Sequence, residues 1–257
     1  MASQAVLTHP TGDDVRIEVV SKPGEVVAGF DCICDAFGNQ ARDAIWMATN
    51  PEWNKSGPEG RPQAAARMVE EWQSITYDNK GRPNKIFLVA TVPSEGKRVV
   101  AGMAVWAQLS MVEGHGDQPS NDLRSSLDLE ALYPGNESEQ RFLCQVWRSF
   151  TTRRVEVAKE KQSSEQPSIF HLSICGVHSA YQRRGIAGKL VQWGLDEAQR
   201  RGGLEAITEA SSMGRGVYAR LGFQGEGSDV KYEVDSEFAS RDLPPNLFMR
   251  TGIGQKS

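Results

Sequence analysis

The stretch Ser168–Gly188, SIFHLSICGVHSAYQRRGIAG, decides the fold of this chain. Its first part, Ile169–Val177, is almost entirely apolar, which is typical of a strand buried on both faces. A polar turn follows at His178–Tyr181. The apolar residues after the turn recur at helical spacing, at Ala187, Leu190, Val191, Gly194 and Ala198. The sequence therefore predicts a strand that runs through a glycine-containing turn directly into an amphipathic helix.

The start of this predicted helix is expected to bind an anion. The first N–H groups of a helix have no partner within it, and the helix dipole is positive at that end. Gly185 and Gly188 lack a Cβ and allow a ligand close to the backbone, while Arg183 and Arg184 supply charge for phosphate oxygens. We predict that residues 182–188 hold a phosphate or pyrophosphate. The alternative is a solvated basic turn before an ordinary helix.

Two blocks of this region resemble a known family. Gln182–Ala187, QRRGIA, resembles the acyl-CoA signature Q/R-x-x-G-x-G/A of the GNAT N-acetyltransferases. Ala210–Phe223 resembles the later block of that family, with its short helix and a Y-x-x-x-G-F ending that begins here at Tyr218. The resemblance covers roughly residues 168–224. It implies an α/β GNAT fold: a mixed, mostly antiparallel central sheet that is splayed at the cofactor-binding strand and flanked by helices.

The same resemblance implies that the protein uses acetyl-CoA and releases CoA. In the family, the turn amides hold the pyrophosphate and the preceding strand pairs with the pantetheine arm. The residues that this implies for cofactor binding are Cys175, Gly176, Val177, Gln182, Arg183, Arg184, Gly185, Ile186, Ala187, Gly188, Ser211 and Tyr218. Gly176 is also where the strand is expected to bulge most easily. Ser211–Ser212 replaces the Asn of some members, which leaves that side of the cofactor contacts open.

Acyl transfer from a thioester to an amine needs a proton acceptor and a donor for the departing thiolate, but no protein nucleophile. Tyr218 is the predicted acid, because a phenol suits a thiolate and a tyrosine of this block commonly acts so in the family. Its alternative role is packing against neighbouring apolar residues. Glu209 is the predicted base, directly or through water, with ordered water alone as the rival. His171 and His178 flank the key strand, and His171 is expected to be a core histidine with satisfied hydrogen bonds.

Composition limits the other classes of function. The chain has 257 residues, of which 39% are hydrophobic and 24% charged, as in soluble globular proteins. Its net charge of −4 gives no electrostatic case for binding nucleic acid, which usually needs a basic face. No apolar run approaches the roughly 20 residues of a membrane span, and the N-terminus lacks the pattern of a secretory signal. The spacing of the cysteines fits neither a zinc site nor a redox pair, so we expect no metal. It favours free thiols and a cytoplasmic location. The cysteines are Cys32, Cys34, Cys144 and Cys175.

The remaining elements are predicted from periodicity. Strands are expected at Val15–Val20, Ile86–Val92, Val99–Gln108, Glu205–Thr208, Lys231–Val234 and Leu247–Arg250. Helices are expected from Pro23 to about Gln40, at Pro62–Tyr77 and at Phe142–Lys161. Ile45–Met47 and Pro51–Trp53 are read as a loop, in which Trp46 and Trp53 either cover the core or line an acceptor site. Residues from Thr251 onward are expected to be a frayed tail.

One domain, 1–257, is predicted, with an insertion at about 109–167 and a C-terminal extension from about 224. The insertion either covers the substrate site or is a solvated excursion. Gly214-x-Gly216-x-x-Ala219 also matches a dinucleotide fingerprint, but Gly222 ends the following helix too soon for that motif.

We interpret the protein as an acetyl-CoA-dependent N-acetyltransferase, an acyltransferase that acts on a primary amine of a small molecule. The acceptor stays open among a small-molecule amine, an antibiotic-like compound, a polyamine and a peptide terminus. Two alternatives stay open: an acetyltransferase acting on a protein or peptide, and a non-catalytic acyl-CoA-binding module. An open acceptor site beside Tyr218 favours the enzyme, and a site plugged by the insertion favours the module. The sequence does not indicate an oligomeric state.

Overall fold

The structure is a computed structural model that describes residues 14–252. The N-terminal segment, for which no secretory signal was predicted, lies outside these residues, and so does most of the predicted C-terminal tail. Thr251, where that tail was expected to begin, is held to the sheet, because its N–H donates to the Ala206 carbonyl over 3.0 Å.

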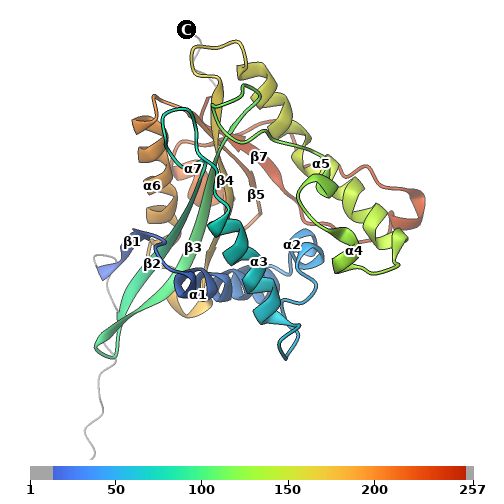
Figure 1. Cartoon of the computed structure of the whole chain (residues 1–257), viewed down its shortest axis with the longest axis horizontal. Helices are drawn as coiled ribbons and strands as arrows, with labels where there is room; N and C mark the ends of the chain where they lie inside the picture. The colour runs from blue at the N-terminus through green and yellow to red at the C-terminus, as the bar shows by residue number, and fades with distance from the viewer. Residues whose placement is uncertain (1–13, 253–257) are drawn as a thin grey trace, which may run out of the picture.

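Within residues 14–252, seven strands form one sheet in the order β1-β2-β3-β4-β5-β7-β6 (Figure 1). All neighbouring pairs are antiparallel except β4 and β5, which run parallel. The sheet is therefore the mixed, mostly antiparallel one that the sequence predicted. The strands are Arg16–Val19 (β1), Lys85–Ser94 (β2), Lys97–Ser110 (β3), Ser168–Val177 (β4), Glu205–Ala210 (β5), Gln224–Gly225 (β6) and Leu247–Arg250 (β7).

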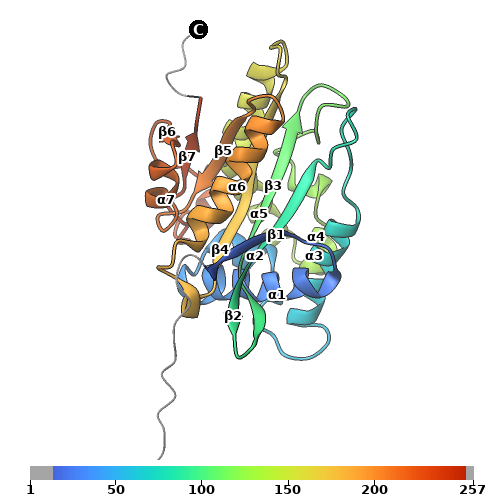
Figure 2. The ribbon, with the colours of Figure 1, turned by 90° about the vertical axis from the view of Figure 1, so that its left-hand side faces the viewer.

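Alternation along the strands sorts the core into two faces. On β2, Phe87 and Val89 join one apolar cluster, whereas Ile86 and Leu88 join the other. The first face is covered by α1 (Pro23–Ile33), the π-helical turn η2 (Cys34–Gln40), α2 (Ala44–Thr49) and α3 (Arg61–Gln73). The second is covered by α6 (Ile186–Arg200) and α7 (Arg215–Arg220), and Figure 2 shows α6 in front of the strands.

The predicted insertion and the C-terminal extension pack on each other. Phe142 of the insertion and Phe238 of the extension lie with ring centroids 5.2 Å apart in a shared apolar cluster. We call residues 111–167 together with 230–246 the lobe, which Figure 1 shows at the side of the sheet. Its short elements are η3 (Leu123–Ser125), α4 (Leu129–Leu132), the long helix α5 (Glu137–Lys161) and η5 (Ser236–Phe238).

Two local predictions were wrong. Ile45–Met47 is not a loop but part of α2, because Asp43 Oδ1 accepts the Trp46 N–H over 2.9 Å and caps the helix. Lys231–Val234 is not a strand: there the Glu233 N–H donates to Ser149 Oγ of α5 over 3.0 Å, so a side chain of the lobe satisfies the backbone instead of a sheet neighbour.

Trp46 and Trp53 are 9% and 8% exposed and lie 5.8 Å apart between ring centroids. They pack in the same cluster as Phe30 of α1, as the core-covering interpretation expects. Across residues 14–252, no helix has the length and apolar character that crossing a membrane requires.

Candidate active site

The parallel strands β4 and β5 part halfway along the sheet. They pair only at Ile169, Phe170 and His171 of β4. The last contact is side chain to backbone: the buried Thr208 hydroxyl donates to the Leu172 carbonyl over 3.1 Å. β4 continues to Val177 on β3 alone, and β5 continues on β7 alone. The edge of β4 that faces β5 therefore lacks a strand partner from Ser173 onward among the described residues, as the predicted splay requires.

The bulge in β4 is at Ser173, not at Gly176 as expected. Ile174 lies opposite Val105, but Leu172 lies opposite Trp106, so Ser173 is the additional residue on this strand. Gly176 serves a different need, since a Cβ there would come within 2.7 Å of the Ile33 side chain of α1. The bulge thus coincides with the point at which β5 departs.

The turn after β4 is fastened to η2. Asp35 Oδ2 accepts the Ser179 N–H over 2.6 Å and also accepts from Gln40 Nε2 over 2.7 Å. Gln182, predicted to bind cofactor, donates its side chain to Gln40 Oε1 over 2.8 Å and to the Val177 carbonyl over 3.0 Å. The Gln182 side chain therefore braces the turn, and only its backbone is left for a ligand.

The N-terminus of α6 has the features of an anion site. Gly185, the residue before the helix, has φ 76° and no side chain caps the helix. A Cβ on Gly185 or Gly188 would meet nothing within 4 Å, so space for a ligand lies beside both. Arg183 is exposed beside them, in a left-handed conformation with φ 63°. These features fit the predicted pyrophosphate at residues 182–188.

The other predicted residues of the turn differ in role. The Arg184 guanidinium lies 5.5 Å from the Tyr181 ring centroid and donates to the Ala180 carbonyl over 3.3 Å. Ile186 is a core residue of the α6 face, 1% exposed, whereas Ala187 is half-buried. The side chains of Arg184 and Ile186 thus shape the turn and anchor the helix.

Tyr218 and Cys175 are neighbours on the α6 face of the sheet. Tyr218 is 8% exposed, and its hydroxyl has no hydrogen-bond partner within residues 14–252. Burial, with a smaller contribution from Cys175, raises the pKa of Tyr218 far above its usual value. Burial also raises the pKa of Cys175 to about 12, so the thiol stays protonated. Ser211 contributes a backbone carbonyl that accepts the Gly214 N–H over 3.0 Å at the start of α7.

Glu209, the predicted base, is a buried and fully engaged carboxylate. Arg154 of α5 binds it with two hydrogen bonds of 2.9 and 2.8 Å, and His171 Nε2 lies 2.8 Å from Oε2. Burial alone would raise the pKa of Glu209, but Arg154 and His171 outweigh burial and hold it at about 2. A carboxylate of such low proton affinity, only 3% exposed, is poorly suited to take a proton directly from a substrate.

Sequence reasoning missed two residues of this cluster. Arg154 lies in the insertion, 55 positions before Glu209, so no local pattern connects the two. Ser173 Oγ lies 3.0 Å from His171 Nδ1. The spacing His171-x-Ser173 on a predicted strand was a usable signal, because alternate residues of a strand share a face. His171 itself is buried with both nitrogens engaged, as predicted.

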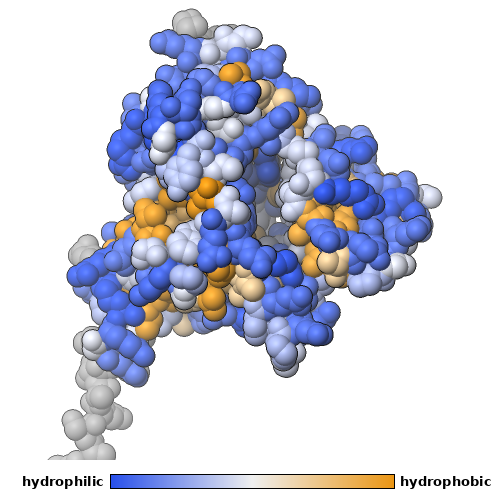
Figure 3. Space-filling model, in the orientation of Figure 1, coloured by the Kyte–Doolittle hydropathy of each residue, from blue (hydrophilic) through white to orange (hydrophobic). Residues whose placement is uncertain are grey.

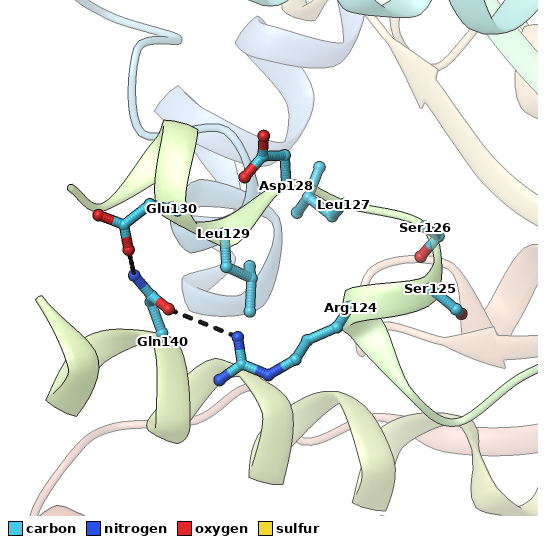
Figure 4. A pocket seen from close by; sticks show the side chains of 8 residues that line it. All are labelled: Arg124, Ser125, Ser126, Leu127, Asp128, Leu129, Glu130 and Gln140. Atoms are coloured by element: carbon cyan, nitrogen blue, oxygen red, sulfur yellow. Dashed lines mark hydrogen bonds between the residues drawn. The ribbon is translucent and has the colours of Figure 1, made fainter. Parts of the chain in front are cut away.

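A hollow between the lobe and the rest of the molecule is visible in Figure 3. A separate open depression of about 490 Å³ lies on the lobe, lined mainly by polar residues of 124–130 and by Gln140 (Figure 4). There Gln140 bridges Arg124 and Glu130, with distances of 3.4 and 2.7 Å. No predicted site residue lines this depression.

Within residues 14–252, no group of His, Cys, Asp and Glu side chains is arranged to hold a metal ion. All four cysteines are free thiols; they are Cys32, Cys34, Cys144 and Cys175. The helix α7 ends at Arg220 after six residues, too short for the dinucleotide motif that its glycines resemble.

Comparison with known proteins agrees with this geometry. Residues 127–223 match the sequence model of the Acetyltransferase (GNAT) family. No curated protein matches the chain. Among solved structures, arylalkylamine N-acetyltransferase 2 from Aedes aegypti is similar, with 18% identity, a TM-score of 0.58, and coverage of 92% of this chain and 98% of that one.

Two further structures are similar over almost the whole chain. An agmatine N-acetyltransferase has 16% identity and a TM-score of 0.56, covering 93% of this chain and 97% of that one. A polyamine N-acetyltransferase from Drosophila melanogaster, which forms N-acetylagmatine, has 16% identity and a TM-score of 0.51, covering 92% and 97%. At these identities the structures establish the fold, and the sequence match establishes the family resemblance over residues 127–223. Residues 127–223 thus resemble the Acetyltransferase (GNAT) family, as the two sequence blocks predicted.

Proposed function

We propose that this protein transfers the acetyl group of acetyl-CoA to a primary amine of a small molecule by direct attack in a ternary complex. The observation that carries the proposal is the parting of β4 from β5, with the uncapped N-terminus of α6 at its end. An unpaired strand edge suits an amide-containing arm, and free helix N–H groups suit phosphates. Acetyl-CoA has both parts, and it supplies the activated acetyl group when bound.

The protein's own residues provide positioning and a proton. The backbone of the β4 edge, at Cys175, Gly176 and Val177, is the proposed contact of the pantetheine arm, and the N–H groups that point away from β3 are the proposed donors to the thioester carbonyl. The amides of 183–188, with the Arg183 side chain, are proposed to hold the pyrophosphate, and Ser211 to border the cofactor. Tyr218 is the proposed acid for the leaving sulfur, because its hydroxyl has no protein partner in the described structure and its pKa is raised.

Three solved structures of similar fold are N-acetyltransferases of small amines, namely arylalkylamines, agmatine and polyamines. They support a small-molecule acceptor here. The hollow beside the lobe offers a place for such a molecule, and the lobe is its proposed wall (Figure 3). The free thiols support our proposal of a reducing, cytoplasmic location.

The test is release of free thiol from acetyl-CoA in the presence of a panel of amines, with acetyl-CoA binding measured by calorimetry. We expect binding by the wild type, and turnover with at least one aliphatic or arylalkyl amine. Turnover only with peptides would favour a protein acetyltransferase, and binding without turnover a non-catalytic module.

Gly185→Glu, with Gly203→Glu as matched control, tests the location of the cofactor site. Both glycines have φ 76° and lie at opposite ends of α6, so the two substitutions impose similar backbone strain. We expect only Gly185→Glu to abolish binding, because it places a carboxylate where the pyrophosphate is proposed to lie. Equal binding by both variants would contradict the proposed site.

A further inference from the structure

Four polar side chains form a continuous chain from the lobe to the bulge in β4. Arg154 of α5 holds both oxygens of Glu209 on β5, at 2.9 and 2.8 Å. Glu209 Oε2 lies 2.8 Å from His171 Nε2, and His171 Nδ1 lies 3.0 Å from Ser173 Oγ. Two strands and one helix therefore converge on one imidazole ring.

The chemistry of the chain fixes where its protons lie. Arg154 and the imidazole hold the Glu209 pKa at about 2, so Glu209 is a carboxylate that only accepts. Burial and the Arg154 cation lower the pKa of His171, so the ring is neutral at neutral pH. His171 Nε2–H then donates to Glu209, and Nδ1 is left to accept from the Ser173 hydroxyl. This is the hydrogen-bond order of a Ser–His–acid triad, with the two ring nitrogens exchanged.

Ser173 is the open end of this chain. His171 and the Glu209 side chain are 2% and 3% exposed, but Ser173 is exposed although it lies on the middle strand of the sheet. An exposed side chain on a central strand means that no helix covers the sheet at that point. On one side of Ser173, Ile174 packs with the α1 cluster, and on the other, Ile169 packs with the α5 cluster. Ser173 thus lies in the gap between these two coverings.

We propose that Ser173 is the proton acceptor for the amine substrate, with His171 receiving the proton and Glu209 and Arg154 positioning the ring. This inference rests on the proposed acetyltransferase function and deepens it. An N–H bond of the substrate ammonium breaks as an O–H bond forms at Ser173, while the original Ser173 proton moves to His171 Nδ1. The freed lone pair of the amine attacks the thioester carbonyl carbon. As the C–S bond breaks, Tyr218 donates its proton to the leaving sulfur, and the surplus proton on the attacking nitrogen returns through water to the Tyr218 oxygen.

The proton on His171 leaves by the same route, through Ser173 to water, once the product has gone. Glu209 stabilises the imidazolium in the interval, as the buried acid of a triad does. The charged groups that act on His171 are Glu209, which favours its protonation, and Arg154 and Lys85, which oppose it. Arg154 limits the basicity of the ring, so the proton is released again rather than kept.

The relay also indicates the class of substrate. An amine that is already neutral in water needs little help from a base, whereas an aliphatic ammonium must lose a proton before it can attack. The structure thus points to acceptors that arrive protonated, such as alkyl or arylalkyl primary amines, rather than anilines.

The test compares Ser173→Ala, Ser173→Thr and, as matched control, Ser164→Ala. Ser164 is exposed at the end of α5, where its hydroxyl bonds only to backbone carbonyls of its own turn, so its loss leaves turnover unchanged. Ser173→Ala removes an exposed hydroxyl and is expected to fold normally. We expect it to lower kcat at neutral pH by at least about 100-fold, with acetyl-CoA binding intact, and Ser173→Thr to restore most of the loss.

The pH profile separates a relay from a merely structural role. The loss in Ser173→Ala should shrink as the pH approaches the pKa of the amine, because the amine then arrives neutral. A loss that is constant with pH, wild-type turnover by Ser173→Ala, or acetylation of Ser173 by acetyl-CoA alone would overturn the relay. If the wild type turned over no amine at all, the proposed function itself would fail, and the two failures are thus distinguishable.

Discussion

Tyr218 shows how a single residue can serve packing and chemistry together. Its ring lies 5.9 Å from that of Phe223, and it is part of the α6-face core. A side chain on Gly214 would collide with the ring, since a Cβ there would lie 2.6 Å from Tyr218 Cε2. The packing interpretation made from the sequence therefore holds for the ring, while the acid role of the hydroxyl stays a proposal.

Tyr218→Phe is predicted to lower kcat by about 100-fold while acetyl-CoA binding and stability are nearly unchanged. The ring still fills its place, but the proton for the leaving sulfur is lost. Because the pKa of Tyr218 is raised, the wild-type acid stays protonated through alkaline pH, so its own titration should not limit the rate there. Steady-state kinetics measure the change in kcat, and calorimetry measures acetyl-CoA binding. Tyr77→Phe is the control, because Tyr77 is 64% exposed.

Residues of the turn could be predicted from sequence, because each acts on its immediate neighbours: Gly185 supplies a left-handed φ just before its own helix. The cluster around Glu209 could not. Its partners Arg154 and His171 lie 55 and 38 positions away and meet only when the sheet forms. The sequence consequently indicated Glu209 but not its partners. The hydrogen bonds and charge of those partners lower the pKa of Glu209 and make direct base catalysis by this residue unfavourable.

At the scale of elements, α6 is positioned by its closest contact with the sheet. A Cβ on Gly194 would lie 2.0 Å from Trp106 Cε2, and Trp106 stacks on Phe170 of β4 at 5.1 Å. The helix therefore approaches β3 and β4 through a glycine-sized gap, and this approach places its N-terminus beside the end of β4. Helical periodicity predicted which face of α6 is buried but not this distance.

Gly194→Ala is predicted to destabilise the protein by about 1–3 kcal/mol, because the added methyl overpacks a core that has no space for it. Gly24→Ala in α1 is the matched control. No atom lies within 4 Å of a Cβ at Gly24, so alanine there should be neutral or stabilising by up to about 1 kcal/mol. Urea unfolding of both variants measures the difference. Equal stabilities would mean that α6 can shift outward at no cost.

At the scale of the whole molecule, the lobe is tied to the sheet at the same place where the proposed chemistry occurs. Arg154 of α5 forms an ion pair with Glu209 of β5, and both side chains are largely buried. The composition of 113–139 predicted an irregular stretch within the insertion, and periodicity predicted α5. Neither could show that the C-terminal segment returns to α5, because that contact replaces the strand expected at 231–234 with bonds such as Glu233 N–H to Ser149 Oγ.

This arrangement predicts an acid-sensitive fold. The pKa of Glu209 is about 2 in the native state against 4.5 ordinarily, so its ionisation stabilises the fold above about pH 4.5, and that contribution is lost as the pH falls toward 2. The native pKa of His171 also lies below its ordinary 6.5, so acid favours the unfolded state there as well. We expect the free energy of unfolding to decline steadily from neutral pH to about pH 3.

Glu209→Gln isolates this contribution. The variant should be less stable than the wild type at neutral pH, because it leaves the buried Arg154 guanidinium without its anion, and its stability should change less between about pH 5 and 3. Amide hydrogen exchange should show α5 opening first as the wild type is acidified, since α5 loses its ionic tie to β5 before the apolar clusters are disturbed. Parallel pH profiles for the two proteins would instead place the acid-sensitive contact elsewhere. Asp78 would then be the next site to test. Burial alone would raise the pKa of Asp78, but Arg82 and neighbouring backbone N–H groups outweigh burial and lower that pKa to about 2.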